Sequence, residues 1–456
     1  MKPTNLVLAA CASMMVGNGL KPVALHGQAL VGDALQGVPQ QSIQLTLDDA
    51  ISRGLATSHR IAEAVARGDA ADAAVGSRHA ATLPQIAAQA GYTRTNHVDE
   101  FGLLTPTNQF RVIYPDVPDN YRTRLDVQWP IYTGGRLDAL ERAARIEATA
   151  SSDEIATARA DLRLEITRAY WALVTARESL RVVEQSVARI DAHVRDVRNQ
   201  LASGLIPPND VLTVEAQRSR QRMLAIQART IADVAEAELA RLVGAEPGTG
   251  IEPAFREEVP PSVSATMSAL VDTAKRQRPE RAMLEKRVNA ASARGAAAAA
   301  GMKPSVALGG GVDYARPNPR IFPREAAWKS SWDVGVNVNW PLFDGGRMRS
   351  ETAEANATAR ALHERLADFD ASLAVELRQR LSEVESSHAA IDAASDSVRS
   401  ATEARRVLGE RFAAGVATST DLLDAQVVLL QAELDRTQAI ANARLADARL
   451  SRALGQ

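Results

Sequence analysis

The sequence predicts a mainly α-helical, internally duplicated chain that also carries four membrane-length β-strands. Three observations support this prediction: a recurring octapeptide, two proline-free stretches of about 66 residues, and four segments in which polar and apolar residues alternate. Long stretches of helix-forming residues favour helices, and alternation with a period of two is typical of strands with one apolar face. Four strands cannot enclose a pore, so the predicted β-barrel is shared among identical copies, and three copies would give twelve strands.

The first 29 residues have the features of a secretory leader. Lys2 is followed by the apolar stretch LVLAACASMMVG and then by small residues near Ala29, which is the order found in cleaved signal peptides. Lipidation at Cys11 is an alternative, because LAAC resembles a lipoprotein processing box, although ten residues make a short lipoprotein leader. Beyond the leader no apolar run reaches the roughly 18 residues of a membrane-spanning helix, so a membrane crossing would use strands.

The recurring octapeptide is WPIYTGGR at 129–136 and WPLFDGGR at 340–347, 211 positions apart. The same offset relates SGLIPPNDVL to AGVATSTDLL and LARLVG to LSRALG, whereas blocks upstream of the strands are offset by 220. The difference predicts a longer loop in the first half. Self-similarity of this kind predicts two structural repeats, 30–243 and 266–456, which the Pro-rich linker 244–265 joins.

Each repeat is predicted to contain a helix, two strands, a very long helix, a tight break and a final helix. Between Trp332 and Trp340 every second residue is apolar, and the residues between them include Asp333 and two asparagines. Periodicity alone fits a half-buried strand of a soluble sheet equally well, but tryptophans at the strand ends favour a membrane. The predicted strands are about 84–95, 121–130, 304–315 and 331–341, and the predicted helical hairpins are 136–243 and 347–455.

The octapeptide is predicted to join the last strand of each repeat to its long helix. A tryptophan at the strand end suits a membrane–water interface, and the following proline is expected to stop ladder pairing. Two glycines then let the backbone turn before the helix begins at Arg136 or Arg347. The predicted joint consists of Trp129, Pro130, Gly134, Gly135, Trp340, Pro341, Gly345 and Gly346.

Composition narrows the possible functions. With 53 basic and 55 acidic residues the formal charge is -2, which disfavours nucleic acid as a partner. One cysteine and seven scattered histidines offer no metal-ligand pattern, and no P-loop, nucleophile elbow or cofactor motif is present, so we expect no metal, no cofactor and no enzyme activity. Two other classes of protein are alternatives to a membrane barrel: a periplasmic adaptor and a structural coiled-coil protein. An adaptor, however, would have compact β domains around one hairpin, and a structural coiled coil would lack the strands.

The duplicated octapeptides, AYWALVTARESLRVVEQSV from Ala169, and the two tips SGLIPPNDVL and AGVATSTDLLDAQ carry a family resemblance. In this order they are similar to the outer-membrane efflux proteins of the TolC type over about residues 45–456. The resemblance implies a homotrimer with a twelve-stranded barrel in the outer membrane of a Gram-negative cell, continuous with a helical coiled-coil tunnel through the periplasm. It also implies a periplasmic adaptor (membrane fusion protein) and an inner-membrane pump or ABC transporter as partners, with export of small molecules or proteins.

The resemblance assigns roles to the hairpin tips. Acidic residues after the second turn ring the periplasmic entrance of family members, and Asp421 and Asp424 match them, with Asp210 as their counterpart in the first half. Asp421 also fits a capping box with Thr418, three residues earlier, and Asp210 fits a residue at a helix start. The adaptor-docking positions are Gly204, Leu205, Gly415 and Val416, and the glycines should end the long helices. Where some members latch the mouth with tyrosine and arginine, this chain has Phe412 and Ala417, which cannot donate such hydrogen bonds, so we expect packing to hold the mouth closed.

Overall fold

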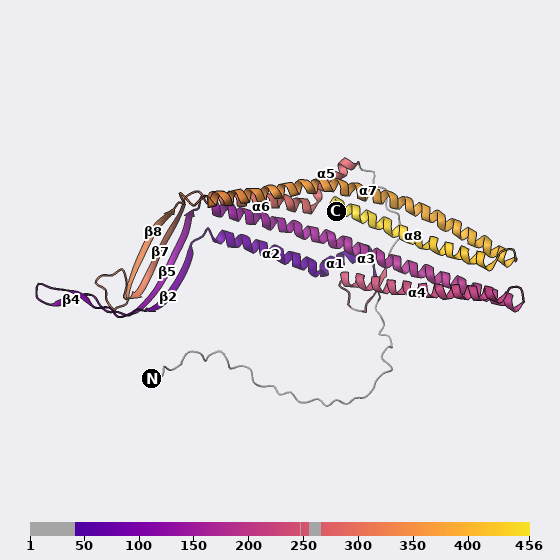
Figure 1. The fold of residues 1–456 in the computed structure, drawn as a ribbon, viewed down its shortest axis with the longest axis horizontal. Helices are drawn as coiled ribbons and strands as arrows, with labels where there is room; N and C mark the ends of the chain where they lie inside the picture. Colours follow the sequence, from indigo (N-terminus) through magenta and orange to yellow (C-terminus); the bar gives the residue numbers. More distant parts are fainter. Residues whose placement is uncertain (1–41, 247, 255–265) are drawn as a thin grey trace, which may run out of the picture. The chain divides into compact units, whose positions relative to one another are not determined.

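The computed structural model describes residues 42–246, 248–254 and 266–456 of the chain (Figure 1). The predicted leader, Cys11 and most of the predicted linker lie outside these residues. Of the helices that are described, none is both long and apolar enough to span a membrane.

Helices and strands follow the same basic order in the two halves of the chain. Each half has two shorter helices, long strands, one helix of 67 residues and a second helix that returns beside it. At about 1.5 Å per residue, each 67-residue helix is roughly 100 Å long. The first half contains β1 (Ser42–Leu45), α1 (Leu47–Thr57), α2 (His59–Ala80), β2 (Gln85–Arg94), β3 (Phe101–Leu104), β4 (Phe110–Tyr114), β5 (Asp119–Tyr132), α3 (Arg136–Ala202), α4 (Pro208–Leu242) and β6 (Gly250–Pro253). The second half contains α5 (Met267–Gln277), α6 (Pro279–Ala300), β7 (Ser305–Arg316), β8 (Lys329–Asn339), α7 (Arg347–Ala413) and α8 (Ser419–Leu454).

Two features differ from the sequence prediction. The helix expected before the strands is two helices in each half, because the backbone is extended at Ser58 and at Arg278. The Ser58 hydroxyl also accepts a hydrogen bond from the Ile61 amide, which caps α2. In addition, β3 pairs with β4 and β1 pairs with β6. These strands have four or five residues, too few for alternation to distinguish them from loops.

The four long strands form one antiparallel sheet in the order β2-β5-β7-β8. Strands from the two halves are therefore neighbours: Leu125 of β5 pairs with Val312 of β7, which pairs with Trp332 of β8. Away from the strand ends, this register places the large apolar side chains of the four strands on one face and the charged ones on the other. Four apolar side chains of β8 (Trp332, Val334, Val336 and Val338) are 62–74% exposed. This face of the sheet is apolar, yet no described helix covers it.

The helices pack around α3, which contacts α1, α2, α4, α6 and α8, while α7 packs against α6 and α8 (Figure 1). The main core cluster surrounds Ile166 and Leu173 of α3 and includes residues of α1, α4, β1 and β6. Within it, the Tyr170 hydroxyl donates to the carbonyl of Ala254 (3.1 Å) and lies 3.3 Å from that of Leu45. Burial raises the pKa of Tyr170 to about 12. A second cluster joins α5, α7 and α8, and a third lies near the hairpin tips.

Candidate functional site

The first hairpin tip is the turn between α3 and α4. Gly204 has φ 69° and donates to the carbonyl of Leu201, while the Leu205 amide donates to Gln200. A left-handed glycine closing these two bonds is a common way to end a helix, so the prediction that Gly204 ends the long helix is confirmed. The next residue, Leu205, is 73% exposed. Asp210 lies in the first turn of α4, half-buried, and accepts a hydrogen bond from Asn209.

The second tip, between α7 and α8, has the same geometry. Gly415 has φ 74° and Val416, which follows it, is exposed. The Thr418 amide donates to Asp421 Oδ2 (2.9 Å), and the Asp421 amide donates to Thr418 Oγ1 (3.1 Å), so the predicted capping box is present. Hydrogen bonds from the Thr418 side chain and backbone lower the pKa of Asp421. Asp421 therefore caps the first turn of α8, and its remaining surface is exposed.

One exposed stripe of α8 is acidic. Its positions recur every three or four residues, the spacing of one helix face, and all of them are exposed. Three carboxylates and no cation lie on it, and Asp435 was not identified from the sequence because only the structure shows which face of α8 is free. We call this surface the acidic stripe: Asp421, Asp424, Val428, Gln431, Asp435, Gln438 and Asn442.

The predicted gate residues lie in the core of the tips. Phe412 is 9% exposed and Ala417 packs beside it, in an apolar cluster built from α3, α4, α7 and α8. The ring of Phe412 meets His193 of α3 edge-on, with centroids 5.0 Å apart. The His193 Nε2 lies 2.9 Å from Ser419 Oγ, and its Nδ1 is buried without a hydrogen-bond partner in the described residues. Packing therefore surrounds Phe412, and the contact between His193 and Ser419, which the sequence did not reveal, joins the two hairpins at the tips.

We expect the tip cluster to weaken in acid because of His193. Burial lowers the pKa of its imidazole, and Asp196 only partly opposes that effect. The unfolded chain takes up a proton as the pH falls below about 6.5, whereas the folded tip resists it, so folding free energy is lost as the pH falls from there toward the lower folded pKa. The protection factors of α3 amides near 193, which compare their exchange with that of unprotected amides at the same pH, should fall as the pH is lowered from about 7.5 to 5.5. A His193→Gln variant keeps a hydrogen-bonding group but does not titrate; an equal fall in the protection factors of that variant would contradict this account.

The strand–helix joints agree closely between the two halves. Gly134 and Gly345 have φ 66° and 70°, and Gly135 and Gly346 have φ 87° and 88°. The tryptophans also act alike, since Trp129 Nε1 donates to the carbonyl of Thr82 (3.2 Å) and Trp340 Nε1 to that of Met302 (3.3 Å). Each tryptophan thereby ties its strand end to the end of the preceding helix.

The prediction for Pro130 is wrong. β5 continues through it to Tyr132, and Pro130 pairs with Ala307 of β7. β2 pairs with β5 only as far as Gln128, so Pro130 has a ladder neighbour on one side alone, and the register shifts between Pro130 and Tyr132. An irregular, one-sided pairing tolerates the missing N–H of proline. Pro341, by contrast, lies beyond the end of β8 at Asn339.

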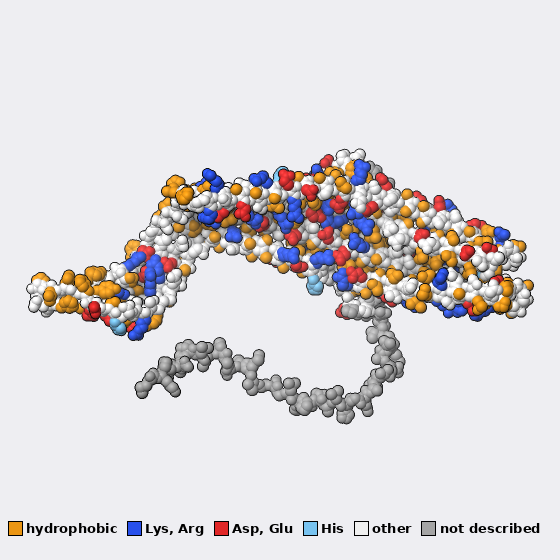
Figure 2. Space-filling view, viewed as in Figure 1, with side chains coloured by type: hydrophobic (Ala, Val, Ile, Leu, Met, Phe, Trp, Pro, Cys, Tyr) orange, Lys and Arg blue, Asp and Glu red, His pale blue; other side chains and the backbone are white. Residues whose placement is uncertain are grey.

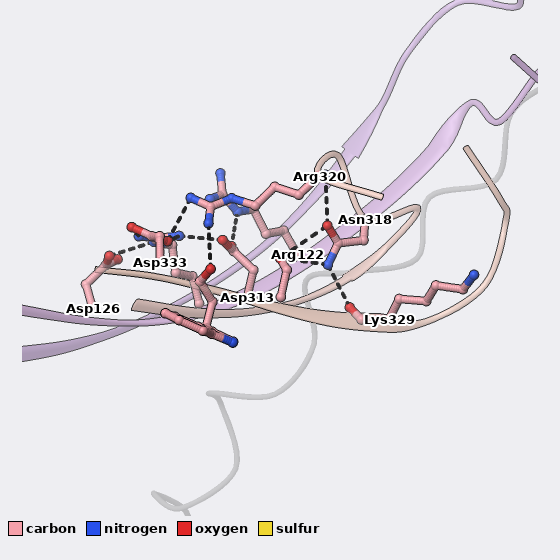
Figure 3. Close-up of polar contacts among 10 residues, drawn as sticks. Arg122, Asp126, Asp313, Asn318, Arg320, Lys329 and Asp333 are labelled. Atoms are coloured by element: carbon pink, nitrogen blue, oxygen red, sulfur yellow. Dashed lines mark hydrogen bonds and ion pairs between the residues drawn. The ribbon is translucent and has the colours of Figure 1, made fainter. Parts of the chain in front are cut away.

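The polar face of the sheet carries an ion-pair network (Figure 3). Arg122 and Arg124 of β5 both bind Asp313 of β7, which is 1% exposed. Arg124 also binds Asp333 of β8 (2.9 Å), and Arg320 from the β7–β8 loop reaches the same carboxylate (2.8 Å). The charges sit opposite the exposed apolar face. The described residues hold no group of three or more potential metal ligands.

The model of the family described as outer membrane efflux protein matches residues 50–245 and 270–456. Outer membrane protein TolC of Vibrio cholerae is 24% identical over 393 residues, covering 86% of this chain and 86% of that protein. Protein CyaE of Bordetella pertussis is 26% identical over 365 residues, with 77% and 73% covered. The crystal structure of the outer membrane protein VceC from Vibrio cholerae superposes with a TM-score of 0.75 at 21% identity, covering 90% of this chain and 96% of that one.

Proposed function

The chain belongs to the outer membrane efflux protein family, and from this premise we propose that three copies form a passive exit duct across the outer membrane and periplasm. The protein is an outer-membrane channel component of an efflux or secretion system. In the proposed assembly, the four-stranded sheets close into a twelve-stranded barrel and the long helices form a tunnel. A periplasmic adaptor and an inner-membrane pump or ABC transporter supply the cargo and the energy, so the duct itself needs no catalytic residue.

The main support for this proposal is the four-stranded sheet, which has one apolar face and one charged face. An apolar face that no described element covers suits lipid, and charges on the opposite face suit a water-filled interior. Trp328 and Trp340 lie immediately before and after β8, roughly 40 Å apart along a strand. At the usual barrel tilt that corresponds to about 30 Å across the membrane, the thickness of the hydrocarbon core.

The edges of the sheet support closure with other copies. β2 pairs only with β5 and β8 only with β7 among the described strands. An unpaired strand edge in hydrocarbon leaves N–H and C=O groups unsatisfied at several kcal/mol each. Pairing β8 of one copy with β2 of the next satisfies both edges.

The outer surface of α4 supports lateral packing of the helices. Its apolar side chains face away from α3 and are more than half exposed, as expected for a surface that another copy covers. They are Leu212, Met223, Ile226, Ile231 and Val234.

We further propose that residues 30–243 and 266–456 are copies of one duplicated unit, with 1–29 as a leader and 244–265 as a linker. The support is geometric. Left-handed glycines recur 211 positions apart at 134 and 345, 135 and 346, 204 and 415, and 244 and 455. Left-handed glycines at four matched positions are expected if the two halves have the same backbone structure, and are rare otherwise.

We propose that the tips contact the adaptor through Gly204, Leu205, Gly415 and Val416. Both turns place one exposed apolar side chain directly after a left-handed glycine. Such exposed apolar residues on a tight turn suit a partner surface.

The proposed duct is tested by adding the purified protein to a planar lipid bilayer. Discrete current steps are expected, together with co-purification of the adaptor from native membranes. Protein that remains in the aqueous phase and carries no current would contradict the proposal.

We predict that the acidic stripe lines the tip end of the duct and attracts cations. Millimolar Ca²⁺ added on the tip side should block the current, and an Asp424→Asn/Asp435→Asn variant should reduce that block severalfold, because rings of carboxylates select cations. This variant leaves the capping box of Asp421 intact. The matched control is Asp233→Asn/Asp272→Asn, which removes two exposed carboxylates elsewhere. Equal block in both variants would exclude the stripe from the pore.

A further inference from the structure

The β3–β4 hairpin exposes apolar side chains (Figure 2, left end), and its register places them on both of its faces. Leu104 pairs with Phe110 on one face, and Leu103 pairs with Arg111 on the other. Phe101, Leu103, Leu104 and Phe110 are all 57–68% exposed. Arg111 is the only charged residue between 101 and 114. A two-stranded hairpin of this kind is marginal in water unless another surface covers it.

The position of the hairpin indicates that the surface covering its apolar side chains is not lipid. Tyr92, Tyr121, Trp328 and Tyr314 form a chain of ring contacts of 5.0–5.8 Å at one end of the sheet. In the proposed barrel this belt lies at a membrane–water interface, where aromatic residues gather. The hairpin follows β2 and precedes β5, beyond Tyr92 and Tyr121, so it lies outside the hydrocarbon.

The base of the hairpin is tied to the charged face of the sheet. Arg324 of the β7–β8 loop donates to the Tyr114 hydroxyl (2.5 Å) and to Asn120 Oδ1 (2.7 Å). Its amide also donates to the carbonyl of Ile113 (3.3 Å). Asn120 shares a strand face with Arg122, since they are two residues apart in β5. In a closed barrel that face is the interior, so the hairpins of all copies start from the inner wall at the same end.

We propose that the β3–β4 hairpin is an interaction surface for the same hairpin of the neighbouring copies, and that three hairpins together form an apolar constriction at the outer mouth. The inference rests on the proposed trimer. In a three-fold ring each copy has two neighbours, and a hairpin with two apolar faces offers one face to each. Anchoring by Arg324 holds the hairpins near one axis, where their exposed side chains can cover one another.

Cysteine cross-linking in membranes tests this contact. A Leu104→Cys variant, treated with a flexible bis-maleimide, should give covalent dimers of the chain in high yield. The control is Val336→Cys, which lies on the apolar face of β8 and should give none. Because the chain also contains Cys11, the unsubstituted protein sets the background.

Two further readouts separate the possible outcomes. If Leu104→Cys fails to cross-link in a preparation that is trimeric by light scattering, the hairpin contact is wrong while the duct survives. If the preparation is monomeric, the proposed function itself fails. If Leu104→Cys does cross-link, replacing Leu104 and Phe110 with serine should also raise the single-channel conductance. An unchanged conductance would mean that the hairpins do not constrict the mouth.

Discussion

Replacing Val336 with arginine should prevent the protein from accumulating in the outer membrane. Val336 is 64% exposed near the middle of β8, so the change would be nearly neutral if water covered that face. In the proposed barrel the side chain faces lipid, where an arginine near the bilayer midplane costs about 2–4 kcal/mol in each chain. Three such chains in one trimer multiply the loss. The measurement is the amount of heat-resistant oligomer in outer-membrane extracts.

The adjacent residue provides the matched control. Asn337 lies on the opposite face of the same strand, so Asn337→Arg adds the same charge toward the water-filled interior. We expect this variant to assemble normally, with at most a change in conductance. Equal amounts of both variants in the membrane would mean that the apolar face does not meet lipid.

The second large effect is expected at the hairpin tips, from Phe412→Ala. Phe412 packs in the cluster that joins α3, α4, α7 and α8 and touches His193. Removing a buried phenylalanine costs about 3–5 kcal/mol. Because this cluster holds the two hairpins together, the loss should loosen the tips rather than unfold the distant core around Ile166. The expected result is a severalfold higher conductance and faster hydrogen exchange in the last turns of α3 and α7.

Val416→Ala is the control for that experiment. It removes an apolar side chain from the same turn, but this side chain is 63% exposed and contributes little to the core. The isolated channel should therefore keep its conductance. A Phe412→Ala channel that also behaves like the unmodified protein would show that the tip cluster does not control the opening.

Features that depend on nearby residues could be predicted from the sequence. Alternation over nine residues places a strand before Trp340, because the side-chain period of a strand is a local property. Gly204 and Gly415 follow long helix-forming stretches, and left-handed glycines are the usual helix ends. The Thr418–Asp421 box needs only a three-residue spacing.

Features that depend on the tertiary arrangement could not be predicted. His193 and Ser419 are 226 residues apart, and neither has a distinctive local setting. Asp435 belongs to the acidic stripe only because its neighbours on α8 are buried by other helices. Pro130 lies within β5 because β2 pairs with β5 only as far as Gln128 and leaves Pro130 with a neighbouring strand on one side. The residues next to a proline in the sequence do not show which strands lie beside it.

Ring closure between copies can be measured directly with cysteines on the two sheet edges. Gln89 of β2 and Asn337 of β8 lie on the polar face at opposite edges, and the double variant Gln89→Cys/Asn337→Cys can be treated with a flexible bis-maleimide in intact membranes. A ring of three copies predicts covalent species of one, two and three chains and nothing larger, with neither single variant forming the trimer. Monomers alone, or a ladder that continues beyond three chains, would contradict a closed barrel built from three sheets.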